Sequence, residues 1–394
     1  CDGSLTYGSM PQNNAAAISS NGATYKTCVK LTDTAGNAPA YGATSAFTAL
    51  ISAPTCTGAT LSGDAADGYI NGTEHLNTTA VISGVTGSSS TVSSTNYAVI
   101  ASSATCDGSQ TFASGVPGSD HSAFTTSGTY KVCARVGDAV SQYGYCSSST
   151  ITSVNVTITF TSIDRTSTVS DGYLNPSEHA STAALVTNLV GTNYDTAKYA
   201  VVASSTTCGA SVTYGASIPT ADDAAISSDG TTYKVCVELS DNAGNPKAYG
   251  TSATFVYDAT APTFSSLPLA NDASDGYINS AEHSLTTDLA GPVSASGYTS
   301  INYALVSSST VCALPLTWVS AAPKANDSGF SAAGNFKVCV QLSDAAGNLT
   351  FGASSVIAYD NVAPVFTSID LANDATNSYI NASEATGSTA VVNN

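Results

Sequence analysis

The chain has 394 residues, with 10 Lys or Arg against 28 Asp or Glu, which gives a net charge of −18. So few basic residues exclude a nucleic-acid-binding surface and argue against docking to an anionic membrane. Hydrophobic residues make up 42% of the chain, yet no apolar run approaches the roughly 18 residues of a membrane span, so we expect a folded chain without membrane insertion.

Two motifs repeat along the chain in phase. DGYINGTEH at Asp67 returns as DGYLNPSEH at Asp171, DGYINSAEH at Asp275 and NSYINASEA at Asn377, at spacings of 104, 104 and 102 residues. A second motif begins YKTCVKLTDTAGN, YKVCARVGDAV, YKVCVELSDNAGN and FKVCVQLSDAAGN. This period is too long for a solenoid unit and matches the size of an ordinary domain, so it predicts an array of domains.

Within one period, the hydrophobic pattern is that of strands. From Tyr233 to Leu239, Tyr, Val, Val and Leu alternate with Lys, Cys and Glu, which predicts a strand with one apolar face. Clusters of Gly, Asn, Asp and Ser interrupt the chain at short intervals. About seven short strands per period are typical of an immunoglobulin-like β-sandwich, so the predicted fold is all-β, a tandem array of such domains.

Proline-bearing segments indicate where one domain passes into the next. They surround Pro54, Pro262 and Pro364, and the equivalent stretch around Ile158 has no proline. The predicted domains are a partial one at 1–52, three complete ones at 53–157, 158–260 and 261–362, and a partial one at 363–394. We therefore expect the sequence to be a window from a longer array.

The stretch DNAGNPKAYGTSATFVYDATAPTF, followed by NDASDGYINSAEH, resembles the bacterial Ig-like repeats of large cell-surface adhesins and biofilm proteins. Those repeats carry a DxAGN turn, a closing strand, an Asp-x-Thr-Ala-Pro linker and an acidic Asn-containing turn. The resemblance covers every predicted domain and implies an extracellular repeat protein. The chain departs from the pattern in its regular cysteine pairs and in lacking the linker Asp at two junctions.

Eight of the ten cysteines form four pairs in register, 27 or 28 residues apart: Cys1/Cys28, Cys106/Cys133, Cys208/Cys236 and Cys312/Cys339. We expect the first of each pair to close the third strand and the second to lie midway along the sixth, which is its neighbour in an Ig sandwich. Disulfides would imply an oxidising, extracytoplasmic setting. Metal binding is the alternative, but the chain has no CxxC motif or Cys/His cluster.

The two remaining cysteines are Cys56 and Cys146. Cys56 replaces the aromatic residue of the first strand, which is Phe160 or Phe264 in other copies, and Cys146 is expected at the start of the last strand. Because first and last strands run side by side in this fold, a fifth disulfide is one interpretation. Two free thiols are the other.

Oxygen-bearing side chains gather at the predicted turns with few Lys or Arg nearby, which is typical of structural Ca²⁺ sites. The candidate ligands are Asp64, Asp67, Asn71, Glu74, Asp171, Asn175, Glu178, Asp241, Asp258, Asp272, Asp275, Asn279, Glu282, Asp344, Asn348 and Asp360. The alternative is that Asp, Asn and Gly are here simply because they form good turns.

Topology strengthens the calcium hypothesis at one junction. In an Ig sandwich the first turn and the exit of the chain share one end, beside the next domain. The exit at Asp258, the turn 171–178 and the turn 344–348 of the next domain are therefore expected to converge. Leu50 stands where Asp258 has its carboxylate, so the junction before Pro54 should depend least on calcium.

Three histidines, His75, His179 and His283, each follow the Glu of this turn. We interpret them as residues that lead into a strand, although a metal or catalytic role is conceivable. The sequence lacks HExxH, GxSxG, GxGxxG and P-loop motifs, and its carboxylates recur once per domain, whereas a catalytic centre is normally unique. The chain is therefore predicted not to be an enzyme.

These features predict a calcium-stiffened, disulfide-stapled stalk of a large bacterial surface adhesin, whose partners are the neighbouring domains of the same chain. An alternative is a subunit of an extracellular fibre or sheath, in which other copies of the chain would be partners. A binding module is a third reading, but one Trp and 8% aromatic residues offer no clustered platform for a sugar. In each case the chain is extracellular or at the bacterial cell surface.

Overall fold

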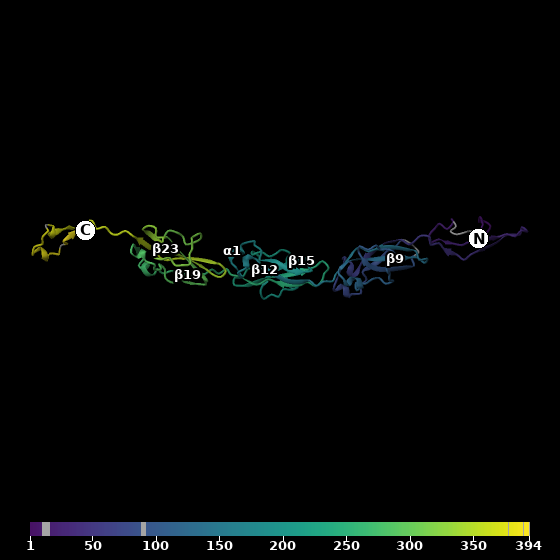
Figure 1. The fold of residues 1–394 in the computed structure, drawn as a ribbon, viewed down its shortest axis with the longest axis horizontal. Helices are drawn as coiled ribbons and strands as arrows, with labels where there is room; N and C mark the ends of the chain where they lie inside the picture. The colour runs from purple at the N-terminus through teal and green to yellow at the C-terminus, as the bar shows by residue number, and fades with distance from the viewer. Residues whose placement is uncertain (10–15, 88–91, 377, 389, 394) are drawn as a thin grey trace. The chain divides into compact units, whose positions relative to one another are not determined.

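The computed structural model describes residues 1–9, 16–87, 92–376, 378–388 and 390–393 (Figure 1). Asn377, which opens the last copy of the first motif, lies outside these residues. The chain divides into two compact units that are described separately. The first is Cys1–Thr168 with Ala183–Ala225 and Tyr233–Thr254, and the second is Val169–Thr182 with Ile226–Thr232 and Phe255–Asn394.

In the first unit, residues 53–157 form two sheets. Their strands are β5 (Cys56–Leu61), β6 (Tyr69–Asn71), β7 (Ile82–Gly87), β8 (Ser94–Ala101), β9 (Gly128–Gly137), β10 (Tyr143–Ser147) and β11 (Ile151–Val154). β5 pairs with β7, while β10, β9, β11 and β6 follow one another in the larger sheet and β8 also pairs with β9. Short 3-10 helices η1 (Gly63–Ala65), η2 (Glu74–Leu76) and η3 (Ser122–Thr125) complete this repeat.

The two sheets enclose one hydrophobic core. Ile82 of β7 packs in the same buried cluster as Val132 of β9 and Ile151 of β11, so the cluster draws on both sheets. Its other buried members are Ala65, Ile70, Val81 and Phe124. Two sheets face to face around one core make a β-sandwich.

The first unit also holds most strands of the next repeat: β12 (Thr159–Arg165), β14 (Val186–Thr192), β15 (Thr196–Ala203), β16 (Thr232–Ser240) and β17 (Ala248–Thr251). β12 pairs with β14, and β16 pairs with both β15 and β17. β16 is buried on both faces: Cys236 is in a disulfide, and the half-exposed Lys247 pairs with buried Glu238 at 2.9 Å. The expected polar face of this strand is therefore not exposed.

In the second unit, β13 (Tyr173–Leu174) pairs in parallel with β18 (Phe255–Tyr257). The four-residue helix α1 (Pro176–His179) follows β13 because Asn175 caps it. The Asn175 side chain accepts hydrogen bonds from the backbone N–H groups of Ser177 and Glu178, and the Glu178 side chain accepts one from the Asn175 N–H. This is a capping box with proline at the first helical position. The 3-10 helix η4 (Ser167–Val169) precedes it.

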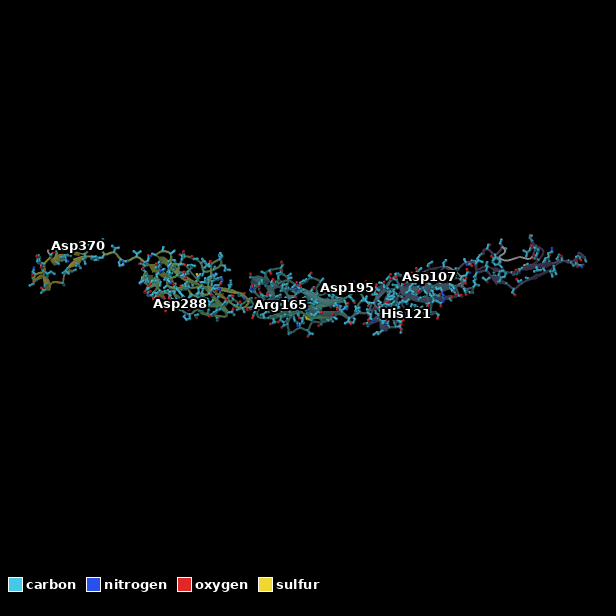
Figure 2. All side chains as sticks on the ribbon, viewed as in Figure 1. Asp107, His121, Arg165, Asp195, Asp288 and Asp370 are labelled. Atoms are coloured by element: carbon cyan, nitrogen blue, oxygen red, sulfur yellow. A yellow bond between two sulfur atoms is a disulfide. The ribbon has the colours of Figure 1, made fainter. Side chains whose placement is uncertain are left out.

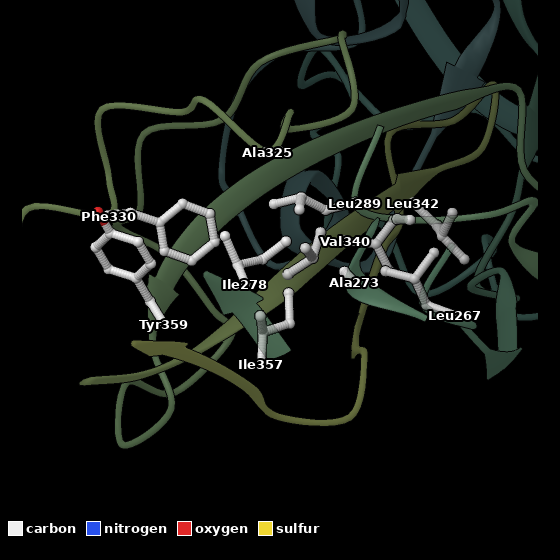
Figure 3. Packing of buried hydrophobic residues seen from close by; sticks show 12 residues of the cluster. Leu267, Ala273, Ile278, Leu289, Ala325, Phe330, Val340, Leu342, Ile357 and Tyr359 are labelled. Atoms are coloured by element: carbon white, nitrogen blue, oxygen red, sulfur yellow. The ribbon is translucent and has the colours of Figure 1, made fainter. Parts of the chain in front are cut away.

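Residues 261–362 repeat the arrangement of 53–157. Their strands are β19 (Thr263–Ser266), β20 (Tyr277–Asn279), β21 (Ser294–Ser296), β22 (Ser300–Ser307), β23 (Gly334–Ser343), β24 (Leu349–Ala353) and β25 (Ile357–Asp360), with η5 (Asn271–Ala273) and η6 (Glu282–Ser284). β19 pairs with β21, and β20, β25, β23 and β22 form the larger sheet with β24 beside β23. Figure 3 shows Ile278, Val340 and Ile357 packed in the core between the sheets.

The first and last stretches of the chain bury much less. Residues 1–52 form β1 (Thr24–Tyr25), β2 (Cys28–Leu31), β3 (Ala40–Ala43) and β4 (Phe47–Thr48), and 363–394 form β26 (Asp370–Leu371), β27 (Val392–Asn393), η7 (Asn373–Ala375) and η8 (Glu384–Thr386). Leu31 is 66% exposed and Phe366 is 77% exposed. Neither stretch encloses a sandwich core within the residues described.

The chain is thus an all-β protein, a tandem array of immunoglobulin-like β-sandwiches, as the sequence predicts. Five disulfides join all ten cysteines: Cys1–Cys28, Cys56–Cys146, Cys106–Cys133, Cys208–Cys236 and Cys312–Cys339. The pairs are those that the register of the repeats predicts, and no cysteine is left as a free thiol or for a metal.

Four details of the expected arrangement are wrong. Cys106 lies in the loop after β8, which ends at Ala101, and Cys133 lies in the fifth strand, not the sixth. Cys146 lies in β10, the strand before the last, because the closing segment is split at buried Ser148, whose hydroxyl accepts a hydrogen bond from the Val132 N–H. The histidines lie in the short helices η2, α1 and η6, and do not lead directly into strands.

Phe160 of β12 and Gly250 of β17 show why Cys56 and Cys146 occupy their positions. A Cβ atom at Gly250 would lie 2.2 Å from the Phe160 ring, and one at Gly352 would lie 2.5 Å from the ring of its own repeat's phenylalanine. Cys56 and Cys146 occupy the equivalent positions in their own repeat. A disulfide therefore replaces a phenylalanine packed on a glycine.

We expect Gly250→Ala to lower the free energy of unfolding of residues 158–260 by about 1–3 kcal/mol, because the new methyl group must displace the Phe160 ring. Gly42→Ala is the matched control: Gly42 holds the same position in 1–52, and a Cβ there meets no atom within 4 Å. Denaturant unfolding measures both variants. Equal effects of the two would contradict this account of the packing.

Candidate functional site at the joints between repeats

A five-residue turn follows the long strand in each repeat: 33–37, 138–142, 241–245 and 344–348. In the turn 241–245, the Asp241 carboxylate accepts hydrogen bonds from the Asn245 backbone N–H at 3.0 Å and from its side-chain Nδ2 at 2.6 Å. The fourth residue has a positive φ, +75° at Gly244, which favours glycine. The two hydrogen bonds from Asn245 to the Asp241 carboxylate therefore stabilise the turn.

Three joints connect consecutive repeats, and they are numbered along the chain. The second joint lies between residues 53–157 and 158–260, within the first unit. Nδ2 of Asn71 donates to the Ala243 carbonyl at 2.8 Å, and the Gly72 N–H donates to Oδ1 of Asn245 at 3.0 Å. In return, Nδ2 of Asn245 donates to the Val154 carbonyl at 2.9 Å. Asn71 and Asn245 are 6% and 4% exposed, so both side chains are largely shielded from water at this joint.

The third joint lies between residues 158–260 and 261–362, within the second unit, and has the same two amide contacts. Nδ2 of Asn175 donates to the Ala346 carbonyl at 2.8 Å, and Nδ2 of Asn348 donates to the Asp258 carbonyl at 2.9 Å. Gly347, at φ +82°, lies against the Asn175 amide. The exit, the first turn and the next repeat's turn thus meet here.

The first joint lies between residues 1–52 and 53–157, within the first unit. Nε2 of Gln142 donates to the Leu50 carbonyl at 2.8 Å, and Ser141 takes the positive φ of the turn glycine, +64°. The acceptor is a backbone carbonyl, so the missing carboxylate at Leu50 does not matter to this bond. Asp138 and Gln142 were not among the predicted residues, although DAVSQ stands in phase with DNAGN and DAAGN.

Most of the other predicted ligands accept hydrogen bonds within the turn in which they lie. Asp67, Asp171 and Asp275 each accept the backbone N–H two residues ahead. Glu74, Glu178 and Glu282 each accept the N–H of the preceding Asn. Asp258 and Asp360 accept the N–H two residues ahead, and Asp64 and Asp272 bind side chains near their own first turn. Turn formation accounts for these contacts, except that of Asp64, which binds the Ser119 hydroxyl of another loop.

Electrostatics in these turns follow from the same contacts. The side-chain and backbone hydrogen bonds from Asn37 hold the pKa of Asp33 below its ordinary value. Partial burial raises the pKa of Glu74, against the opposing hydrogen bond from the Asn71 N–H, and the charges of Asp67 and Asp64 raise it further. Acidic side chains occur along the whole chain, as Asp107, Asp195, Asp288 and Asp370 illustrate (Figure 2).

We tested whether the joints fit Ca²⁺, which takes six to eight oxygen ligands. Among the residues that the structure describes, no group of three or more His, Cys, Asp or Glu side chains lies close enough to hold a metal ion. At the third joint the Asp258 carbonyl and the Asp344 carboxylate both accept from Nδ2 of Asn348. The contacts that the structure shows between these repeats are thus hydrogen bonds from an amide, and calcium at the joint stays a prediction.

No family model and no curated protein matches the chain. Among solved structures, it is similar to part of a 1.5-MDa bacterial ice-binding adhesin, with 16% identity over 79% of this chain and 98% of that one and a TM-score of 0.36. It is also similar to a Ca²⁺-stabilised adhesin of an Antarctic bacterium, with 18% identity over 85% of this chain and 81% of that one and a TM-score of 0.31. A tetra-tandem repeat from the extending region of a large adhesion protein aligns with 14% identity over 82% and 78% and a TM-score of 0.25. These scores are low, and no family is assigned from them.

Proposed function

We propose that the chain is a non-enzymatic structural and adhesive repeat protein of the bacterial cell surface, a stalk whose joined domains hold a binding region away from the cell. The observation that carries the proposal is the recurrence of one joint. A turn amide donates to a carbonyl at or just after the final strand of the preceding repeat at all three joints, at 2.8–2.9 Å. Such uniform joints suit a spacer, in which every repeat transmits load to the next.

The proposal assigns one domain to each of 53–157, 158–260 and 261–362, and parts of domains to 1–52 and 363–394. Seven strands in each complete range support it, as do the separate cores of 53–157 and 261–362. The joints lie at the ends of these ranges: Val154 is the last residue of β11, and Asp258 follows β18. Each domain would then fold largely on its own contacts.

An extracellular location is supported by the five disulfides, since such bridges persist in oxidising compartments. In the described part of the chain, no helix has the length and apolar character that a bilayer crossing requires. The recurring carboxylates cap turns in each repeat, which supports a structural role for them and no catalytic one.

Calcium, which the sequence predicts, is proposed to bind at carboxylate oxygens that the amide contacts between repeats leave open. Among the described residues, one carboxylate oxygen of Asp171, Asp258 and Asp360 accepts no hydrogen bond, and the net charge of −18 favours cations near the chain. In this view the repeats contact one another through hydrogen bonds, and the ion makes no contact between them. Excess chelator distinguishes this view from a joint that calcium closes.

Brief protease treatment of intact cells that make the protein should release peptides of residues 53–362, and mass spectrometry identifies them. The disulfide-linked peptide pairs should be recovered intact without reducing agent, because a surface stalk matures outside the cytoplasm. A cytoplasmic protein of the same cells is the control and should release nothing. Recovery of the chain only after cell lysis, with reduced cysteines, would overturn the proposed location.

A further inference from the structure

Asparagine followed by glycine occurs twice in the sequence, at Asn21–Gly22 and at Asn71–Gly72. The second pair lies at the second joint, where Asn71 is the last residue of β6. The other copies of this motif have Asn175–Pro176, Asn279–Ser280 and Asn381–Ala382. The second joint thus has glycine where the third joint has proline.

Glycine makes the preceding asparagine prone to deamidation, because it has no side chain to hinder its backbone nitrogen. In this reaction the Gly72 nitrogen bonds to Cγ of Asn71 and closes a succinimide ring. The bond from Cγ to Nδ2 breaks, and Nδ2 leaves as ammonia with the proton of the Gly72 N–H. Water then adds to either ring carbonyl and opens the ring, which leaves aspartate or isoaspartate at position 71. Water is the only co-reactant, and nothing is oxidised or reduced.

In the closed joint both reacting groups are held apart by hydrogen bonds. Nδ2 of Asn71 donates to the Ala243 carbonyl at 2.8 Å, and its Oδ1 accepts two backbone N–H groups of its own turn at 2.9 Å. The Gly72 N–H donates to Oδ1 of Asn245 at 3.0 Å. Asn71 is also 6% exposed. Its side chain cannot turn toward the Gly72 nitrogen unless these bonds break, so the reaction needs the joint to open.

The surroundings of Gly72 supply water and explain the glycine. A cavity of about 230 Å³ beside it is lined by residues of both repeats, among them Asn155 and Asn245, and has room for water. A Cβ atom at position 72 would lie 2.8 Å from Oδ1 of Asn155. At the third joint Ala259 stands where Asn155 does, and Pro176 stands where Gly72 does. The reactive pair therefore follows from the packing of this one joint.

We propose that Asn71 is a site of spontaneous modification, which deamidates only while the second joint is open. In the product a carboxylate oxygen replaces Nδ2 and faces the Ala243 carbonyl, so a hydrogen bond gives way to two acceptors. Isoaspartate also lengthens the backbone between β6 and η2 by a methylene. A joint that is held open for long therefore cannot close again with its former contacts. This inference goes beyond the proposed function, since it needs the contacts of the joint and no role as a stalk.

Ageing of the full chain at mildly alkaline pH tests the proposal, because base removes the proton of the attacking nitrogen. Peptide mass spectrometry follows Asn71 and Asn21 in one sample; Asn21 has the same glycine neighbour but is exposed. In concentrated urea with a reductant, the two should deamidate at similar rates. In the folded chain, Asn71 should be slowed far more than Asn21. An Asn71 that reacts as fast in the folded chain as in urea would overturn the proposal.

Asn245→Ala removes two of the three hydrogen bonds across the joint, so the rate at Asn71 should rise roughly 30-fold while the rate at Asn21 stays unchanged. Gln110→Ala removes an amide that bonds within its own loop and should change neither rate. If Asn71 of the Asn245→Ala chain keeps its amide after Asn21 has reacted completely, opening the joint does not expose it and the proposal fails.

The effect on the joint has its own measurement. In the aged chain, the fraction of Gly72 N–H groups that exchange as fast as in Asn71→Asp should equal the fraction deamidated. Gly72→Pro with Asn155→Ala installs the pair of the third joint, and its Asn71 should stay unmodified because proline has no N–H to lose. By small-angle scattering, ageing should loosen the unaltered chain more than this variant. Equal loosening of both would place the cause outside position 71 and overturn the proposal.

Discussion

Replacing Cys56 and Cys146 by serine should lower the free energy of unfolding of residues 53–157 by about 4–5 kcal/mol. The bridge closes a loop of 90 residues, the longest in the chain, and the loss of closure entropy in the unfolded state grows with loop length. The Cys208–Cys236 bridge closes a loop of only 28 residues, so replacing these two cysteines by serine should lower the free energy of unfolding by about 3–4 kcal/mol. Denaturant unfolding of each variant measures both losses.

The double variant Cys56→Phe with Cys146→Gly is the sharper control. It installs the pair that Phe160 and Gly250 form in the following repeat. We expect it to be more stable than the serine variant, because the aromatic ring regains the apolar contact that serine lacks. A phenylalanine variant no more stable than the serine variant would show that the two arrangements are not interchangeable.

The second large effect is expected at the second joint. Asn71→Asp keeps the cap oxygen and removes the donor to Ala243, and Asn245→Ala removes both contacts of its amide. At about 1 kcal/mol for each of three hydrogen bonds, the double variant should raise the opening constant of the joint roughly 100-fold. Hydrogen exchange at the Gly72 N–H reports this opening in Asn71→Asp, which keeps the Asn245 acceptor, and small-angle scattering follows the double variant, which lacks it.

Gln110→Ala again serves as the control, since its amide bonds only within its own loop. The unaltered chain should keep its slow Gly72 exchange in excess chelator, because the joint closes through nitrogen donors and carbonyl acceptors. If chelator alone speeds Gly72 exchange as much as Asn71→Asp does, calcium closes the joint and the direct hydrogen bonds are secondary.

Much of the fold could be predicted because the repeat preserves register. Cys133, Cys236 and Cys339 stand at equal phase in three copies, so their partners follow from spacing alone. The split of the closing strand could not be predicted, since it depends on a serine hydroxyl within the fold. The hydroxyls of Ser148, Ser252 and Ser354 each accept a hydrogen bond from the backbone N–H of a residue on the long strand.

The joints could be predicted only in part. The sequence marks Asn175 and Asn348, but their acceptors are carbonyls of Ala346 and Asp258, and every residue has a carbonyl whatever its side chain. Side-chain patterns therefore predict carboxylates and a cation, but they carry no signal for contacts between amides and the backbone. The contact of Gln142 is not predicted by the sequence because its motif is altered, although glutamine offers the same amide on a side chain one methylene longer.

The nested bridges in residues 53–157 have a consequence for pulling force. When a repeat unravels under tension, residues inside a disulfide loop cannot extend. In residues 158–260, the bridge between residues 28 apart keeps roughly 90 Å of contour length, at about 3.4 Å per residue, from extending. The other residues of this repeat can extend. In residues 53–157, the bridge across 90 residues withholds about 300 Å, nearly the whole repeat. Tension then passes through the sulfur bond from β5 to β10, and this repeat acts as an inextensible link beside neighbours that can lengthen and absorb a sudden load.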